Sequence, residues 1–462
     1  MSIWPPNPSS LNRPAYRSLA RSLIDAIDAG EIRPGARLPS HRTLAFELGL
    51  SVHTVSRAYE ELSRLGYISG EVGRGSFVST GPADAAVPWH RLQGSEDMID
   101  CSMLAPVTGE IHVERMSQTL AALSQHVAPS VLFSFRPKAS LAPHTLHARR
   151  WLDTCGLNTQ PDLIIPTNGN TAAMTVALMT AAIPGDLVVT EALGHHTLRS
   201  LTAALGLRLA GLAIDEEGIV PEAFERACSA GPVKVLYCMP SGLGPTLAFM
   251  SEERRAALCE IAAAYNVAII ENDAWGPMDE NRPPPLATIA PDRTFYFTGL
   301  TKCLLPGLRI AWLVVPEAMI SAARTRHLVT NWMATALMAE IATTWIANGT
   351  AEALMAWQRK QLARRNAMVS ETLSGLPHRA APHALHIWLP LPEPWQEDAF
   401  VAHARANGVA VAASSNFTNG EGPFSPAVRV CVGAGSEAEI AKGLGIIARL
   451  ARSAPEPALL AV

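Results

Sequence analysis

From residue 98 onward, short apolar runs alternate with Ala- and Leu-rich segments of helical period. Several of these runs are apolar at consecutive positions rather than at every second one, which is typical of strands covered on both faces. Strands separated by helices predict a mostly parallel, doubly wound α/β sheet. The expected strands are 163–166, 187–190, 207–213, 233–238, 267–271, 294–297 and 309–315.

The last hundred residues have a different pattern. A long helix is expected over 345–368, and strands are expected at 386–389 and 428–432. This order predicts a smaller α+β lobe at the carboxyl end. We therefore assign residues 98–462 to one large α/β domain that includes this lobe.

The amino-terminal part forms a separate unit over residues 12–79. Ser40 and Ser51 are good N-caps for two short helices that follow a first amphipathic helix. Residues 67–78 form two short alternating runs around glycines, which predicts a β-hairpin. Three short helices and a hairpin describe a winged helix-turn-helix. Residues 80–97 contain Gly, Pro and Ala with few apolar anchors and are expected to be a linker.

Charge is distributed unevenly between these parts. The 462-residue chain has a formal net charge of −4, which excludes DNA binding through bulk charge. Residues 1–80, however, hold nine arginines, no lysine and seven acidic residues, so this part is positive while the rest is negative. In a winged helix the third helix enters the major groove and the wing follows the phosphates. The residues expected to contact double-stranded DNA are Arg42, Ser51, His53, Thr54, Arg57 and, at the hairpin tip, Arg74.

Other classes of protein are not favoured. The longest nearly apolar stretch, 171–183, is too short to span a bilayer, so no membrane association is expected. The seven cysteines are odd in number and include no C-x-x-C pair, which favours a reduced, cytoplasmic setting. His144, His147, His195 and His196 have no cysteine or acid beside them at metal spacing, so we expect no metal site.

One lysine stands in a chemically suggestive place. Only five of the 37 basic residues are lysines, and Lys302 follows the expected strand that ends at Phe297. Arg309 lies seven residues later. A lysine at a strand end offers an amine for a Schiff base, and the arginine offers a partner for a phosphate.

Two windows resemble known families. Residues 38–45, 48–60 and 65–68 together resemble the GntR-type winged-helix domain. Residues 298–309 resemble the lysine motif of fold-type I pyridoxal-phosphate aminotransferases, and the likeness extends over almost all of 98–440. A GntR-type domain fused to an aminotransferase-like domain is the layout of the MocR subgroup of transcription regulators. The resemblance implies a homodimer that binds an operator and senses a small amino compound able to exchange at Lys302.

The resemblance also implies roles for individual residues. The loop that opens a helix after residue 167 would hold the phosphate of pyridoxal 5'-phosphate through backbone N–H groups. Arg429 would grip the carboxylate of the effector. The positions implied for the cofactor are Gly169, Asn170, Thr171, His195, Asn272, Trp275, Thr301, Lys302 and Arg309.

Several of these positions depart from the family pattern. The aspartate that keeps the pyridine nitrogen protonated is replaced, by its spacing, by Asn272, which can form a hydrogen bond but cannot hold a proton there. The neighbouring Asp273 is the alternative partner, although adjacent strand-end residues point in opposite directions. Trp275 stands where a tyrosine reaches the phenolic oxygen, and His195 replaces the stacking tyrosine.

Three further departures remove polar side chains. Gly244 replaces an asparagine that bonds the phenolic oxygen, and Gly299 replaces a phosphate-binding hydroxyl. In the recognition helix, Val52 replaces an arginine, so that contact with a thymine methyl takes the place of guanine reading.

Four interpretations follow. In the first, the protein holds pyridoxal phosphate on Lys302 as a non-catalytic sensor. In the second, the cofactor is lost and the pocket is vacant or adapted to another ligand. In the third, the chain is a working aminotransferase with a DNA-binding extension, against which Asn272 weighs because it leaves the carbanion poorly stabilised. In the fourth, the large domain serves only for dimerisation. We favour the sensor.

Overall fold

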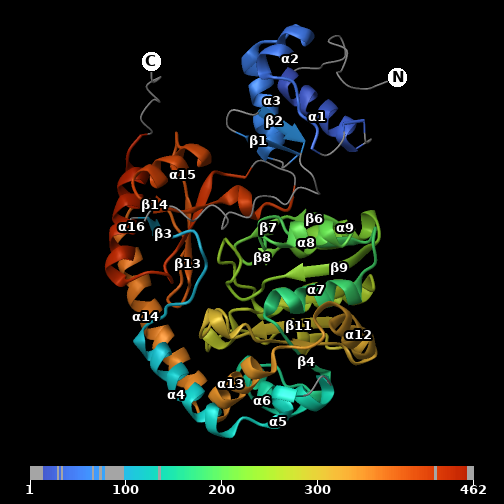
Figure 1. The fold of residues 1–462 in the computed structure, drawn as a ribbon, viewed down its shortest axis with the longest axis vertical. Helices are drawn as coiled ribbons and strands as arrows, with labels where there is room; N and C mark the ends of the chain where they lie inside the picture. The colour runs from blue at the N-terminus through green and yellow to red at the C-terminus, as the bar shows by residue number, and fades with distance from the viewer. Residues whose placement is uncertain are drawn as a thin grey trace. The chain divides into compact units, whose positions relative to one another are not determined.

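The chain is described here by a computed structural model that covers residues 14–28, 31–32, 35–64, 67–71, 75–78, 98–133, 137–420 and 424–454. It divides into two compact units, Met1–Ser95 and Glu96–Val462 (Figure 1). The expected linker, 80–97, lies outside the described residues.

The first unit has the three helices and the hairpin that the sequence predicts. Two helix starts have the expected caps, because the side chains of Ser40 and Ser51 accept hydrogen bonds from the backbone N–H groups of Thr43 (3.2 Å) and Thr54 (3.1 Å). Gly49, with φ +62°, ends the second helix in a left-handed conformation. The elements are α1 (Ala15–Asp28), α2 (His41–Leu48), α3 (Val52–Arg64), β1 (Ile68–Glu71) and the antiparallel β2 (Gly75–Val78).

The second unit is built on a seven-stranded sheet with the order β4-β12-β11-β10-β9-β5-β6. Every pair is parallel except those made by β12, which runs antiparallel to both β11 and β4. The mostly parallel, doubly wound sheet is therefore confirmed. Its strands are β4 (Ile164–Thr167), β5 (Leu187–Glu191), β6 (Arg208–Leu212), β9 (Val233–Cys238), β10 (Ala268–Asn272), β11 (Thr294–Gly299) and β12 (Ala311–Val314).

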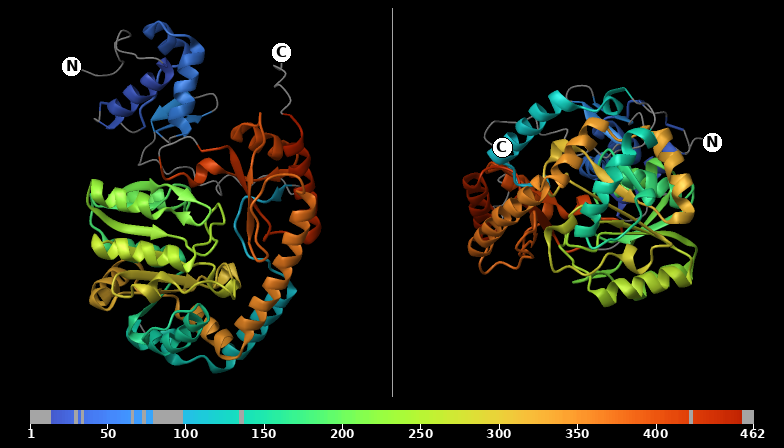
Figure 2. Two further views of the ribbon diagram at one scale, coloured as in Figure 1. Left: turned by 180° about the vertical axis from the view of Figure 1, so that it is seen from behind. Right: turned by 90° about the horizontal axis from the view of Figure 1, so that it is seen from below.

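Helices cover the sheet, as the fully apolar strands require (Figure 2). One core joins the strands to α7 and α12, and a second core joins them to α9, α10 and α11. A β-hairpin, β7 (Ile214–Asp215) with β8 (Gly218–Ile219), follows β6. The helices of this part are α7 (Asn170–Ala181), α8 (Leu198–Ala204), α9 (Pro221–Ala230), α10 (Glu252–Ala264), α11 (Leu286–Ile289) and α12 (Ile320–Asn331).

A third core of the same unit holds the helical segments that lead to the smaller lobe. Figure 1 shows α4 and α14 running side by side toward that lobe, and the two helices are in contact. The long helix expected over 345–368 is wrong in its start, because α13 ends at Ala347 and Gly349, with φ +81°, separates it from α14. The helices are α4 (Glu110–His126), α5 (Pro129–Phe133), α6 (Pro137–Thr154), α13 (Ala336–Ala347) and α14 (Thr350–Thr372).

The smaller lobe is α+β, as expected. Its antiparallel sheet has the order β13-β16-β15, and a separate parallel pair joins β14 to β3, the first strand after the linker. The lobe thus contains both the beginning and the end of the second unit. Its elements are β3 (Ile99–Asp100), β13 (His386–Pro390), α15 (Glu397–Ala406), β14 (Val409–Ala410), β15 (Ala412–Ala413), β16 (Ala427–Cys431) and α16 (Glu437–Arg452).

Candidate functional site

The start of α3 presents most of the residues expected to read DNA. Ser51 and Thr54 are joined by a 2.8 Å hydrogen bond between their hydroxyls, so both contribute to the helix cap. His53 is exposed, and Val52 is 45% exposed, which leaves its methyl groups open to contact. Arg42 is exposed in the first turn of α2.

Arg57, on the exposed side of α3, packs against an aromatic ring of α1. Its guanidinium lies 4.0 Å from the centroid of the Tyr16 ring of α1, an arrangement that stabilises a cation on an aromatic face. The side chain remains exposed. Arg74 lies outside the described residues.

In the second unit, a glycine and an arginine meet at the start of α7. Gly169 precedes the helix with φ +83°, and a Cβ added there would lie 3.0 Å from Nη2 of Arg309. Arg309 itself has φ +47°, two residues before β12 begins. The guanidinium therefore lies against a bare stretch of backbone at a helix N-terminus, where an anion is favoured by both charge and unpaired N–H groups.

The neighbouring polar side chains also suit an anion. Oγ1 of Thr301 and Oδ1 of Asn170 are buried and form no hydrogen bond within the described residues. Thr171, by contrast, is exposed. A Cβ on Gly299 would lie 2.8 Å from Asn170 Oδ1 and 2.7 Å from the Ala311 Cβ. The glycine that replaces the family's hydroxyl is thus required by close packing.

Lys302 follows β11 and is largely enclosed. Burial lowers the pKa of its amine to about 8, while nearby Cys431 raises the pKa and the cations Arg429 and Arg309 lower it. Its Nζ donates a hydrogen bond to the carbonyl oxygen of Leu104. A depressed pKa increases the neutral, nucleophilic fraction of the amine.

Asn272 occupies the end of β10 and has two hydrogen bonds. Its Nδ2 donates to Tyr237 Oη (2.7 Å), and its Oδ1 accepts from the Ala274 backbone N–H (3.1 Å). The side chain is 2% exposed. Because the Oδ1 is used by the backbone, the second N–H of the amide is the group left to donate toward a ligand.

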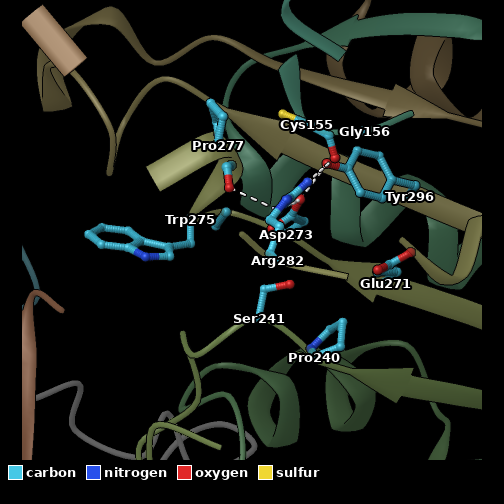
Figure 3. Close-up of polar contacts among 12 residues, drawn as sticks. Cys155, Gly156, Pro240, Ser241, Glu271, Asp273, Trp275, Pro277, Arg282 and Tyr296 are labelled. Atoms are coloured by element: carbon cyan, nitrogen blue, oxygen red, sulfur yellow. Dashed lines mark hydrogen bonds and ion pairs between the residues drawn. The ribbon is translucent and has the colours of Figure 1, made fainter. Parts of the chain in front are cut away.

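Asp273 points to the opposite side, as strand alternation predicts. It forms a 2.6 Å ion pair with Arg282, which also donates to the carbonyl oxygens of Gly276 (2.8 Å) and Cys155 (Figure 3). Tyr296 donates a further hydrogen bond to the same carboxylate oxygen. The alternative assignment of Asp273 as the pyridine partner is therefore not supported by its contacts. Trp275 points away from this pair in Figure 3 and is 6% exposed.

Imidazoles and an arginine gather near Lys302. The rings of His195 and His196 stack with centroids 4.8 Å apart, and His195 meets the Tyr237 ring edge-on at 6.3 Å. Burial, the second imidazole, Lys302 and Arg429 together lower the pKa of His195 well below its ordinary value. Burial, with Arg429 and Lys302, lowers the pKa of His196 to about 4. Both rings are neutral near pH 7.

Arg429 on β16 is 8% exposed. Its Nη2 donates to the carbonyl oxygen of Ser102 (2.8 Å), and its guanidinium lies 4.5 Å from the Phe417 ring centroid. Its Nε is buried and forms no hydrogen bond within the described residues. Nε2 of His386, on the adjacent β13, donates to Gly244 O (3.1 Å) and so holds the loop in which the family's asparagine is missing.

A cavity of about 370 Å³ lies elsewhere in this unit, beside the Asp273–Arg282 pair. Its lining includes Cys155, Pro277, Arg282, Met355 and Arg359, and none of the residues implied for the cofactor. Both arginines are engaged by backbone carbonyls, so we do not assign this cavity to the cofactor.

Sequence reasoning missed four residues that contribute to the site. Tyr237 orients Asn272, Arg282 holds Asp273 away from it, and Ser102 with Leu104 contacts the two cations. The Tyr237 position follows from strand order, since β9 pairs with β10. No local pattern identifies the contacts of Ser102 and Leu104. Among the described residues, no group of three or more His, Cys, Asp or Glu side chains could hold a metal ion.

Comparison with known proteins matches the two units to two different families. Residues 15–78 match the model of bacterial regulatory proteins of the gntR family, and residues 120–447 match that of aminotransferase class I and II. The chain belongs to the aminotransferase class I and II family. Its gntR-type domain precedes the aminotransferase domain, which is the layout of the MocR subgroup.

Several relatives match this chain over most of their length. The HTH-type transcriptional regulator YdeF of Bacillus subtilis is 29% identical, covering 97% of this chain and 96% of that protein. The pyridoxine biosynthesis regulator PdxR of Corynebacterium glutamicum is 25% identical, covering 90% and 89%. MocR of Rhizobium meliloti, a probable rhizopine catabolism regulatory protein, is 26% identical, covering 66% of each chain.

Solved structures show the fold of the second unit. An archaeal alanine:glyoxylate aminotransferase has a TM-score of 0.71 at 23% identity, covering 77% of this chain and 91% of that one. The α-aminoadipate aminotransferase LysN of Thermus thermophilus, complexed with N-(5'-phosphopyridoxyl)-L-leucine, has a TM-score of 0.68 at 20% identity, covering 79% and 96%. The fold-type I aminotransferase architecture expected from the sequence is confirmed. No helix in the described part of the chain is both long and apolar enough to cross a membrane.

Proposed function

We propose that this protein is a DNA-binding transcription regulator whose aminotransferase-like unit binds pyridoxal phosphate and senses a small amino compound. The observation that carries the proposal is the meeting of Arg309, the bare backbone of Gly169 and the buried amine of Lys302 in a chain that also has a gntR-type domain. The relatives named as HTH-type regulators support the regulatory role.

The residues present fit the cofactor at its phosphate and amine ends. Arg309, the N–H groups at the start of α7 and the Thr301 hydroxyl would hold the phosphate, and Lys302 would hold the aldehyde carbon. The unpartnered, buried oxygens of Thr301 and Asn170 support this placement, because buried polar atoms normally have a hydrogen-bond partner. Pyridoxal phosphate, when bound, supplies an electron-withdrawing ring to an attached amine.

At the ring end, the chain's own residues favour sensing over catalysis. Asn272 would donate its free N–H to the pyridine nitrogen, which leaves that nitrogen without a proton. The neutral His195 would stack on the ring without adding a charge. Arg429 would bind a carboxylate through its buried guanidinium. Transamination would therefore be slow, while occupancy would still depend on the amino compound.

The cofactor assignment is tested by mixing the purified protein with pyridoxal phosphate, recording the visible spectrum, reducing with borohydride and mapping the labelled peptide. We expect the label on Lys302 and its loss in Lys302→Met. Lys234, which is exposed on β9, serves as the control lysine, and Lys234→Met should be labelled like the wild type. The absence of both the band and the label would refute cofactor binding and leave the cofactor-free regulator.

The catalytic alternative is tested on the same sample. Turnover of an amino acid with a keto-acid acceptor at ordinary enzyme rates would refute a purely regulatory role and favour an aminotransferase with a DNA-binding extension. A slow or absent reaction with intact labelling supports the sensor.

DNA binding is proposed at the start of α3, with Arg42 and Arg57 as the cationic contacts and a homodimer presenting two such faces to paired half-sites. Arg42→Ala and Arg57→Ala should weaken binding to the DNA upstream of the regulated gene without unfolding the protein. Arg57→Ala also removes the contact with Tyr16, so its thermal unfolding must be measured alongside. Unchanged affinity in a salt titration would refute the proposed face. Sedimentation tests the dimer.

A further inference from the structure

Residues 101–105, here called the strap, connect β3 to the segment before α4 and lie against the two cations of the proposed ligand site. The beginning of the strap is fixed to the small lobe, because Cys101 N donates to Ala410 O (2.9 Å) and Cys431 N donates to Cys101 O (2.7 Å). Beyond that point, Ser102 still contacts β16, because its carbonyl oxygen accepts from Cys431 Sγ (3.6 Å) as well as from Arg429, and Leu104 contacts Lys302.

Two carbonyl oxygens of the strap accept hydrogen bonds from Arg429 and Lys302. Ser102 O accepts from Arg429 Nη2 at 2.8 Å, and Leu104 O accepts from Lys302 Nζ. A carbonyl oxygen is an acceptor of the same kind as a carboxylate oxygen, although it is uncharged. Each of the two groups proposed to hold a ligand therefore has an acceptor from the chain itself.

We propose that the strap is a built-in competitor for the ligand site, so that a carboxylate reaching Arg429 or an aldehyde reaching Lys302 must displace it. This inference rests on the proposed function. The strap follows β3, which begins at Ile99, shortly after the first unit ends at Ser95.

Gly433 offers a way to loosen the strap without touching either cation. A Cβ at this position would lie 1.7 Å from Ala105 O and 2.9 Å from Ala105 C, whereas the nearest other atom, Leu385 Cδ2, is 3.2 Å away. Gly433 is not among the glycines with positive φ, so alanine is otherwise compatible with its backbone. Gly433→Ala should therefore act mainly by pushing the strap away. Gly445 on α16, where a Cβ would meet nothing within 4 Å, provides the matched control.

Met103 provides a reporter at the centre of the strap. It is 46% exposed, and all seven native cysteines are buried. In the full-length chain carrying Met103→Cys, the rate of reaction with a thiol reagent then measures how freely the strap moves. We expect this rate to rise about tenfold or more when Gly433→Ala or Lys302→Met is added, and to remain unchanged when Gly445→Ala is added.

The decisive measurement is the affinity for pyridoxal phosphate itself, titrated by absorbance. If the strap competes, Gly433→Ala tightens binding by about tenfold, which a purely supporting role of the strap would not produce. Weaker binding in Gly433→Ala, or a thiol rate that Lys302→Met leaves unchanged, would overturn the inference. If no variant shows a pyridoxal phosphate band, the cofactor assignment is refuted. The change in the thiol reaction rate on adding Lys302→Met would still decide whether that lysine holds the strap.

Discussion

Replacing Asp273 by asparagine separates the two candidate partners of the pyridine nitrogen. The Asp273 carboxylate is 1% exposed and its partner Arg282 is 7% exposed, with 2.6 Å between the paired atoms. Asp273→Asn leaves the Arg282 charge buried with neutral acceptors alone, which are the new amide oxygen and the carbonyl oxygens of Gly276 and Cys155. Breaking a buried ion pair by removing one partner costs about 3–5 kcal/mol. We expect a loss in the lower part of that range, because the two carbonyls remain.

The loss of stability is measured by urea unfolding followed through tryptophan fluorescence. Asp292→Asn is the matched control, because its 2.9 Å pair with Arg293 is 66% exposed at the aspartate and should contribute less than about 1 kcal/mol. The spectrum with pyridoxal phosphate should be the same in Asp273→Asn as in the wild type. A free energy of unfolding near that of the control variant, together with an altered cofactor spectrum, would refute the reasoning. Asp273 would then be the better candidate for the partner of the pyridine nitrogen.

Three further predictions concern the same pocket. Asn272→Asp keeps the acceptor for the Ala274 N–H and replaces the donor to Tyr237 Oη by an oxygen that can accept from the Tyr237 hydroxyl. It also adds a charge that would keep the pyridine nitrogen protonated, so the half-reaction with an amino acid should accelerate at least tenfold in a single-turnover absorbance experiment. The lowered pKa of Lys302 predicts that its labelling by pyridoxal phosphate rises with pH and reaches half its maximum near pH 8, since only the neutral amine reacts. A midpoint near pH 10 would show that burial does not lower the pKa of this amine. Gly299→Ser should destabilise the fold by about 1–3 kcal/mol because its Cβ meets Ala311 at 2.7 Å, whereas Gly307→Ser, with open space around it, should not.

Local features of the fold were predictable because their causes are local. The caps at Ser40 and Ser51 and the left-handed Gly49 satisfy backbone groups within a few residues, so the sequence alone indicates where those helices begin or end. The direction of β12 was not predictable, because it depends on the order of strands far apart in the chain. The break at Gly349 has a local signal, but the apolar period continues across it and masks the glycine.

The site was predictable to the extent that it follows strand alternation. Opposite directions for Asn272 and Asp273 follow from their adjacent positions at the end of β10. Their partners, Tyr237 and Arg282, come from another strand and from a later loop, and the contact of Arg57 with Tyr16 joins two helices. Such pairs depend on packing between distant segments, which residue spacing does not encode.

The departures from the family pattern are not spread evenly over the proposed site. Lys302 and Arg309, at the amine and phosphate ends, are the residues on which holding a cofactor depends. Gly299 is a replacement at the phosphate end, but the other replaced residues, Gly244, Asn272, Trp275 and His195, would contact the ring, where a catalyst needs a proton on the nitrogen to stabilise a carbanion. A sensor needs only that the occupancy of its pocket change with the concentration of the amino compound. It functions better if the cofactor does not convert that compound into a product. Because Asn272 already has a fixed partner in Tyr237, its amide is held in one orientation, which favours a defined ring contact over a degenerate pocket. On the proposed function, the changes at the ring remove catalysis while the ends retain binding.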